Sequence, residues 1–225
     1  MHGAQSLSAT LELVSDNDTT HFSTIGSSTF LRSIDGRLLF KFVADKYHWR
    51  TDFWRWLGRD VLSKRLPGRY DARHESKSAQ ILASLGQATV NSHAYGCSLN
   101  PLNVLSSVYV IEFITAATSG RRHFHSLAEP ARQAFIAEMM EQAVALVRHG
   151  YLHRDFHLDN LLIDPQGTII WIDTHLRKLP ANQHKRARLL AASISPTKLD
   201  GTVYAAQALD ILAAHFPEVA QYRKA

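Results

Sequence analysis

The sequence has a single cysteine, Cys97, and lacks any apolar run long enough to cross a membrane. One cysteine excludes an internal disulfide and is typical of a reducing compartment. A membrane-spanning helix needs about 18 or more consecutive apolar residues. The first residues also lack the charged start and apolar core of a signal peptide. We therefore expect a cytoplasmic protein.

Neither an internal repeat nor a low-complexity segment is visible, and the composition is that of an ordinary globular protein. Of the 225 residues, 45% are hydrophobic and 20% are charged, so the chain can bury a sizeable core. The net charge is +5, which favours an acidic partner. No recognised nucleic-acid-binding motif accompanies that charge, so we do not expect nucleic acid as the partner.

One segment carries an informative arrangement of polar residues. It reads His153-Arg154-Asp155-Phe156-His157-Leu158-Asp159-Asn160, and Asp173 follows within Ile170-Trp171-Ile172-Asp173. In phosphoryl transfer, one carboxylate orients the attacking hydroxyl, while an asparagine and a second acid hold the metal ion on the nucleotide phosphates. The pattern predicts Asp155 as the catalytic base, with His153 beside it among the catalytic residues. Asn160 and Asp173 are the predicted metal ligands.

The residues between the two halves of this pattern predict a tight β-hairpin. Leu161–Ile163 and Thr168–Ile172 are strand-like, and Asp164–Gly167 is a turn signal. Such a hairpin brings Asn160, at the entry to its first strand, back toward Asp173. A helix predicted over Pro130–His149 precedes the segment. The tripeptide His153-Arg154-Asp155 alone would be weak evidence, because short motifs arise by chance in loops. Asn160, the predicted hairpin and Asp173 follow the tripeptide at the spacing that the chemistry needs. A chance match of the whole pattern is therefore a poor explanation.

These residues resemble the catalytic core of the protein-kinase-like superfamily. Arg154 is typical of protein kinases, whereas His157 stands where aminoglycoside- and choline-type kinases carry His. The mixture is similar to the bacterial lipopolysaccharide core kinases, which phosphorylate Kdo or heptose sugars. Asp173 is followed by Thr174-His175 and not by Phe-Gly, so the Phe switch of regulated protein kinases is missing.

The resemblance implies a lysine that contacts the nucleotide phosphates and a helix-borne glutamate that holds it. Lys41 lies in the strand-like stretch Arg37–Val43, between two phenylalanines. Glu75 is the only acid in a predicted helix over Ala72–Leu85. We therefore predict a Lys41–Glu75 pair. The alternative is a solvated lysine and an unrelated surface glutamate.

The nucleotide itself should contact two further segments, according to the resemblance. Gly26 and Ser27 lie in a run of small hydroxyl residues, where backbone N–H groups could cradle phosphate. The run is poor in glycine, and an ordinary turn between strands explains it equally well. The strand-like run Val108–Ile114 would end at the hinge, where backbone groups of Glu112, Phe113 and Ile114 would bind adenine.

A basic and aromatic insertion lies between the lysine strand and the glutamate helix, over residues 46–73. It holds three of the four tryptophans, Trp49, Trp54 and Trp56, and many arginines and lysines. Such a mixture suits an anionic membrane surface or a phosphorylated glycan. A helical insertion that packs its tryptophans on the N-terminal lobe is the third alternative.

Together these features predict an α+β, bilobal protein-kinase-like fold, with a small antiparallel sheet in the N-terminal lobe and a compact, mostly helical C-terminal lobe. We expect one domain over residues 1–225, divided at about residues 114–115. The expected activity is ATP- and Mg-dependent phosphorylation of a sugar hydroxyl of the lipopolysaccharide inner core. Expected partners are this glycolipid or another anionic acceptor, together with peripheral contact with the membrane's inner face. A soluble small-molecule kinase and a catalytically silent pseudokinase are the alternatives.

Overall fold

The computed structural model describes residues 19–25, 28–98, 100 and 105–222. The chain divides into two compact units. The N-terminal unit contains the described residues up to Ala79 together with Val90–Thr115, and the C-terminal unit contains Gln80–Thr89 and the residues from Ala116 onward. Helix α3 (Asp71–Ser84) contributes residues to both units.

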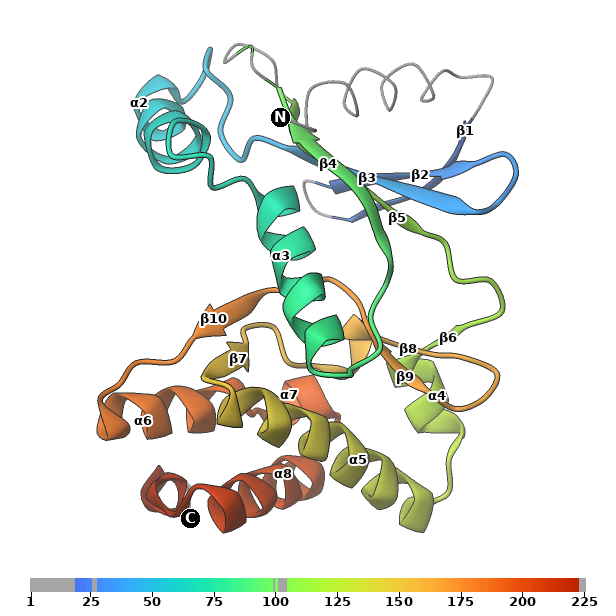
Figure 1. Ribbon diagram of the computed structural model, residues 1–225, viewed down its shortest axis with the longest axis vertical. Helices are drawn as coiled ribbons and strands as arrows, with labels where there is room; N and C mark the ends of the chain where they lie inside the picture. Colours follow the sequence, from blue (N-terminus) through green and yellow to red (C-terminus); the bar gives the residue numbers. More distant parts are fainter. Residues whose placement is uncertain (1–18, 26–27, 99, 101–104, 223–225) are drawn as a thin grey trace. The chain divides into compact units, whose positions relative to one another are not determined.

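A five-stranded antiparallel sheet forms the N-terminal unit, with strand order β1-β2-β3-β5-β4 (Figure 1). Its hydrophobic core is small. Apolar side chains from β3 and β5 meet on one face of the sheet, where Phe40, Val108 and Val110 are buried. The strands are β1 (Thr19–Ile25), β2 (Ser28–Ser33), β3 (Leu38–Ala44), β4 (Ser92–Cys97) and β5 (Leu105–Glu112).

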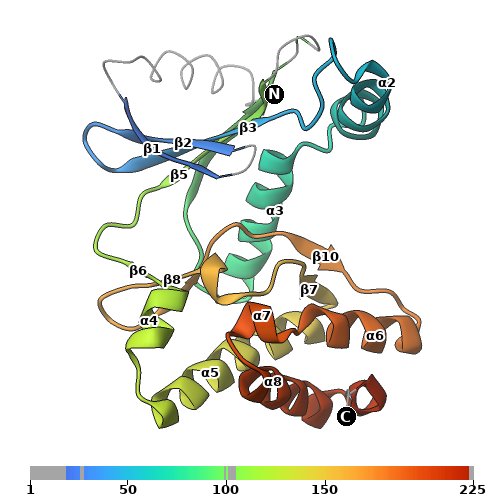
Figure 2. The same ribbon diagram turned by 180° about the vertical axis from the view of Figure 1, so that it is seen from behind.

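The predicted basic insertion is helical. A single turn, α2 (Phe53–Arg55), continues into the π-helical segment η1 (Trp56–Arg65), and α3 follows. Figures 1 and 2 show the α2–η1 coil joined by loops to β3 and α3 and standing apart from the sheet. Helix α3 begins and ends within one residue of the range predicted from the sequence.

The C-terminal unit is mostly helical, and its described residues also form five short strands. Helix α5 (Glu129–Arg148) supplies the centre of its core through Ile136, Met139 and Met140, which are fully buried. The other elements are β6 (Thr118–Ser119), α4 (Gly120–Ser126), β7 (Tyr151–His153), η2 (Leu158–Asn160), β8 (Leu161–Ile163), β9 (Ile169–Trp171), β10 (Leu176–Lys178), α6 (Gln183–Ser193), α7 (Pro196–Leu199), α8 (Thr202–His215) and η3 (Pro217–Tyr222).

Local sequence signals explain the course of the chain around the catalytic segment. Pro130 lies in the first turn of α5, where its missing N–H is not needed. Gly150 follows the helix with φ 82°, a left-handed conformation that ends helices readily. Strands β8 and β9 pair antiparallel, with Leu161 opposite Trp171. The N–H groups of Asp164 and Gly167 close the turn between them, so the predicted hairpin is present.

The sequence-based predictions were wrong in two local details, the position of Asn160 and the end of β5. Asn160 does not enter a strand: it is the last residue of the single 3-10 turn η2, and β8 begins one residue later. The short helix α4 contains His123 and His125, and Ser119 caps it by accepting a hydrogen bond from the N–H of Arg122. Strand β5 ends at Glu112, so Phe113 and Ile114 follow it.

The sheet-containing N-terminal unit and the helical C-terminal unit confirm the predicted α+β fold class. Among the described residues, no helix combines the length and apolar character needed to cross a membrane.

Candidate active site

Lys41 and Glu75 form an ion pair inside the N-terminal unit. Lys41 lies in the middle of β3, opposite Phe30 of β2 and Tyr109 of β5. Its Nζ donates to Oε1 of Glu75 at 2.7 Å. The lysine and glutamate side chains are only 10% and 3% exposed. The structure therefore brings together the two residues that the sequence paired, while their role with a nucleotide stays a prediction.

Burial makes this pair informative. Removing two charges from water costs several kcal/mol per ion, and their mutual attraction offsets that cost only when the geometry is good. A buried pair is therefore weak evidence for stability, and apolar residues of similar size would often serve the fold as well. A buried Lys41–Glu75 pair on the central strand β3 is therefore better explained by a function of the lysine than by stability.

The structure describes only one of the two segments predicted to contact the nucleotide. Gly26 and Ser27 lie outside the described residues. At the other segment, the N–H of Glu112 donates to the carbonyl of Asn91 and the N–H of Phe113 donates to the carbonyl of Arg37. These two donors are already used within the unit. Any backbone contact to adenine would therefore come from carbonyl oxygens or from the N–H of Ile114.

Strand pairing places Asp155 and Asp173 on adjacent segments of the C-terminal unit. In the β7–β10 ladder His153 lies opposite Leu176, and the N–H of Arg154 donates to the carbonyl of His175 at 2.8 Å. Asp155 is the next residue along one segment, and Asp173 lies two residues before His175 on the other. Both side chains are exposed, as a carboxylate must be to meet a substrate or a cation.

Asn160 joins these two segments. Its side-chain Nδ2 donates to the backbone carbonyl of Asp155 at 2.7 Å, and its own carbonyl accepts from the N–H of Ile172 at 3.0 Å. Asn160 is only 6% exposed, so the amide is fixed. Because Nδ2 is used by the loop, Oδ1 is the atom of this side chain that can face a cation.

Asp173 has an unusual backbone conformation. Its φ is 50°, in the left-handed region that few residues other than glycine and asparagine adopt at low cost. Strained backbone of this kind is enriched at functional sites. Its carboxylate lies 3.9 Å from Nε2 of His175. Carboxylate and amide oxygens are the donors that Mg²⁺ prefers, so Asp173 and Asn160 fit the predicted metal.

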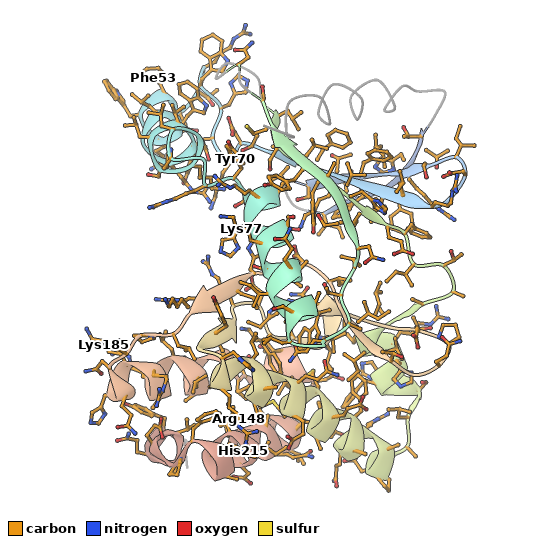
Figure 3. The ribbon with its side chains drawn as sticks, viewed as in Figure 1. Phe53, Tyr70, Lys77, Arg148, Lys185 and His215 are labelled. Carbon is orange, nitrogen blue, oxygen red and sulfur yellow. The ribbon has the colours of Figure 1, made fainter. Side chains whose placement is uncertain are left out.

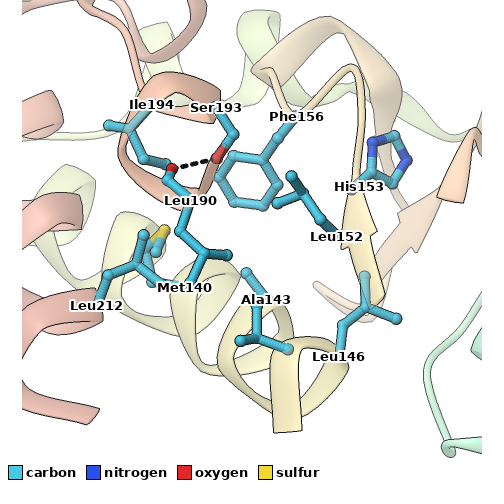
Figure 4. A pocket seen from close by; sticks show the side chains of 11 residues that line it. Met140, Ala143, Leu146, Leu152, His153, Phe156, Leu190, Ser193, Ile194 and Leu212 are labelled. Atoms are coloured by element: carbon cyan, nitrogen blue, oxygen red, sulfur yellow. Dashed lines mark hydrogen bonds between the residues drawn. The ribbon is translucent and has the colours of Figure 1, made fainter. Parts of the chain in front are cut away.

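His153 is buried and does not face solvent. It is 2% exposed, and its ring packs against the ring of Trp171 at a centroid distance of 5.0 Å. It lines a small apolar pocket with Leu152 and Phe156 (Figure 4). Neither ring nitrogen has a hydrogen-bond partner among the described residues. Burial lowers the pKa of His153 to about 4, partly offset by the charge of Asp155. A buried neutral imidazole suits a role in positioning Asp155 better than one in proton transfer.

A charged cluster that the sequence patterns did not predict holds η2. Nε and Nη2 of Arg121 donate to the two carboxylate oxygens of Asp159, at 2.7 and 2.9 Å. Nη1 of Arg121 donates to Asp200 at 2.9 Å, and His125 lies 3.0 Å from the same carboxylate. Asp159 directly precedes Asn160, so the cluster fixes the turn that presents the predicted metal ligand. Hydrogen bonds from Arg121 lower the pKa of Asp159.

A close backbone approach at Gly120 also positions η2. A Cβ atom at this residue would lie 2.6 Å from the carbonyl oxygen of Leu158 and 2.7 Å from Cβ of Leu161. Only glycine allows α4 to approach η2 and β8 so closely. Nothing in the local sequence marks Gly120, because the clash arises from residues distant in the chain.

This combination of sheet, ion pair and paired acids defines a kinase-type phosphotransferase, and comparison with known families agrees. The model of the APH family, described as the phosphotransferase enzyme family, matches residues 39–173, which is more than half of the chain. The chain belongs to this family and is a phosphotransferase enzyme. Among curated proteins, no sequence matches it significantly.

Two solved structures share the fold. The first is "WaaP in complex with acyl carrier protein", with a TM-score of 0.55 and 16% identity over 91% of this chain and 89% of that chain. The second is WbdD, with a TM-score of 0.50 and 16% identity over 92% of this chain. This match spans 48% of the WbdD chain. The predicted resemblance to the protein-kinase-like superfamily is confirmed, and at this identity the structures show the fold alone.

Proposed function

We propose that this phosphotransferase transfers the terminal phosphoryl group of ATP to a sugar hydroxyl of the lipopolysaccharide inner core, in the cytoplasm. The observation that carries the proposal is the hydrogen-bonded linkage of Asp155, Asn160 and the segment leading to Asp173. Phosphoryl transfer depends almost entirely on positioning and charge stabilisation. A site whose acid and amide are fixed by the backbone supports that chemistry.

Each residue has a distinct role in the proposal. Asp155 orients the acceptor hydroxyl and accepts its proton as the hydroxyl oxygen bonds to the γ-phosphorus and the bond from that phosphorus to the leaving ADP breaks. Oδ1 of Asn160 and the carboxylate of Asp173 would hold Mg²⁺, which when bound would neutralise charge on the phosphate oxygens. Lys41, held by Glu75, contacts the phosphates that are not transferred. His153 supports the loop that carries Asp155.

The sugar acceptor is supported by the mixed character of the catalytic segment, in which Arg154 and His157 occur together as in the lipopolysaccharide core kinases. The basic insertion of the N-terminal unit also suits an anionic acceptor. A soluble aminoglycoside- or choline-like substrate is the second candidate, favoured by His157 and by the family match over residues 39–173.

The first test is nucleotide binding. ATP with Mg²⁺ should raise the melting temperature of the wild-type chain, because a ligand that binds only the folded state stabilises it. Asp173→Ala should lose the metal-dependent part of this shift. Glu138→Ala, which removes an exposed carboxylate from α5, is the matched control and should keep it. The absence of any shift in the wild type would favour a pseudokinase.

The second test is transfer itself. Radiolabelled ATP is offered with core oligosaccharides and, separately, with aminoglycosides and choline. Asp155→Ala should reduce transfer by about a thousandfold or more while ATP still binds, since base and orientation are both lost. Near-normal turnover by this variant would overturn the mechanism. Transfer only to a small soluble acceptor would overturn the lipopolysaccharide assignment and keep the phosphotransferase chemistry.

A further inference from the structure

The positive charge of this protein is concentrated in one segment. Of the 25 basic and 20 acidic side chains in the chain, eight basic and three acidic ones lie between Lys46 and Arg73. The rest of the chain is therefore balanced, and the whole excess of +5 belongs to the α2–η1 insertion and its flanks. A charge confined in this way indicates a local binding surface.

The acids of the segment offset only part of this charge at the surface. Asp60 is buried and its Oδ2 accepts from the backbone N–H of Tyr47 at 3.2 Å. Asp71 forms an ion pair with Lys64 at 2.7 Å, and Asp52 lies 3.9 Å from Arg55. Lys46, Arg50 and Arg69 are exposed. The segment therefore presents a cationic surface to solvent.

The inner side of the α2–η1 coil is fixed to the N-terminal unit. Trp56 is 5% exposed and its Nε1 donates to Oδ2 of Asp45 at 3.2 Å. With Asp60 buried one turn later, this side of the coil supplies the packing that holds it in place. Trp54, Leu62 and Leu66, by contrast, are exposed.

The opposite side of the coil carries exposed apolar residues whose positions differ by multiples of four. Trp54 is 80% exposed, Leu62 is 54% exposed and Leu66 is 73% exposed, and Gly58 lies between the first two. In a π-helical turn the hydrogen bonds run from residue i to i+5, so residues four apart stay on one side. Trp54, Leu62 and Leu66 therefore form one outer stripe. Phe53, labelled in Figure 3 on this coil, is 46% exposed and contacts the ring of Trp54 at 5.2 Å.

We propose that the outer stripe inserts into the surface of a membrane that contains anionic lipids, with the surrounding arginines and lysines on the lipid phosphates. Exposed tryptophan and leucine side chains are stabilised at the boundary between headgroups and acyl chains. Each nearby basic residue adds attraction to an anionic leaflet. The exposed apolar stripe among basic residues matches the apolar interior and anionic headgroups of such a membrane surface. This inference does not depend on the proposed phosphotransfer reaction.

Vesicle sedimentation of the full chain tests the proposal. Wild-type protein should bind vesicles of phosphatidylcholine with about 30% phosphatidylglycerol, and bind at least tenfold more weakly to pure phosphatidylcholine or at high salt. The stripe variant Trp54→Ser, Leu62→Ser, Leu66→Ser should lose at least tenfold in binding. The control variant Ile34→Ser, Val203→Ser removes residues that are 64% and 61% exposed elsewhere and should bind like the wild type.

Tryptophan fluorescence gives a second readout. Trp54 is largely exposed, whereas Trp56 and Trp171 are buried at 5% and 2% exposure. Binding should shift the emission to shorter wavelength, and Trp54→Phe should remove most of that shift. Melting temperatures within a few degrees of the wild type show that the variants are folded.

Three results would overturn the proposal. One is a wild-type chain that binds neither vesicle. Another is equal binding by the stripe variant and the wild type. The third is stripe-dependent binding to a purified acidic protein with no binding to anionic vesicles, which would assign the surface to a protein partner instead.

Discussion

His153 should make the stability of this protein sensitive to acid. The pKa of the folded state is about 4, because the imidazole is buried against Trp171, whereas the ordinary value is 6.5. At a pH between these two pKa values, His153 is mostly protonated in the unfolded chain and mostly neutral in the folded chain. The free energy of unfolding therefore falls as the pH falls through this window.

The magnitude follows from the two pKa values. A difference of one unit corresponds to about 1.4 kcal/mol. Complete titration of His153 would therefore cost about 3 kcal/mol, and lowering the pH from about 7 to about 5 should cost about 2 kcal/mol. This is a substantial part of the 5–15 kcal/mol typical of a folded protein.

The assay is urea unfolding at the two pH values for wild type and His153→Leu, with a chelator present to exclude metal effects. The leucine removes the titrating ring and leaves no buried unsatisfied nitrogen, so its stability near pH 7 should change by about 1 kcal/mol or less. Its loss of stability at about pH 5 should be smaller than that of the wild type by about 2 kcal/mol.

His184→Leu is the matched control, because His184 is exposed on α6. This variant should keep the pH dependence of the wild type. If His153→Leu lost as much stability on acidification as the wild type, the reasoning from burial would be refuted.

Two further predictions concern the packing around η2. Gly120→Ala should cost about 1–3 kcal/mol in denaturant unfolding, since the new methyl group meets the Leu158 carbonyl. Gly58→Ala is the control, because a Cβ at Gly58 would have nothing within 4 Å; it should be neutral or stabilising by up to about 1 kcal/mol. Similar losses of stability in both variants would contradict the close approach of α4 to η2 at Gly120. Arg121→Ala should release Asp159 and raise the Mg²⁺ concentration for half-maximal activity severalfold, with a stability loss of about 1–2 kcal/mol. Arg122→Ala, an exposed neighbour, should leave both unchanged, and an unaltered Mg²⁺ dependence in Arg121→Ala would exclude a positioning role for this arginine.

The sequence by itself determined the elements of the fold and the types of residue at the site. Helix α5, with Pro130 at its start and Gly150 after its end, follows from periodicity and from two residues with fixed backbone preferences. The β8–β9 hairpin follows from a turn signal between two apolar runs. These are local properties, since each depends on residues within a few positions of one another. The concentration of charge in residues 46–73 was equally visible.

Only the tertiary structure decided how the site is held. Arg121 reaches Asp159 and Asp200, which lie 38 and 79 positions away in the chain. The clash that makes glycine necessary at residue 120 also comes from a distant segment. Burial of His153 depends on the ring of Trp171, and the exposure of Trp54 depends on which side of its coil Trp56 and Asp60 occupy. Contacts of this kind arise from packing between segments, and no local pattern encodes them.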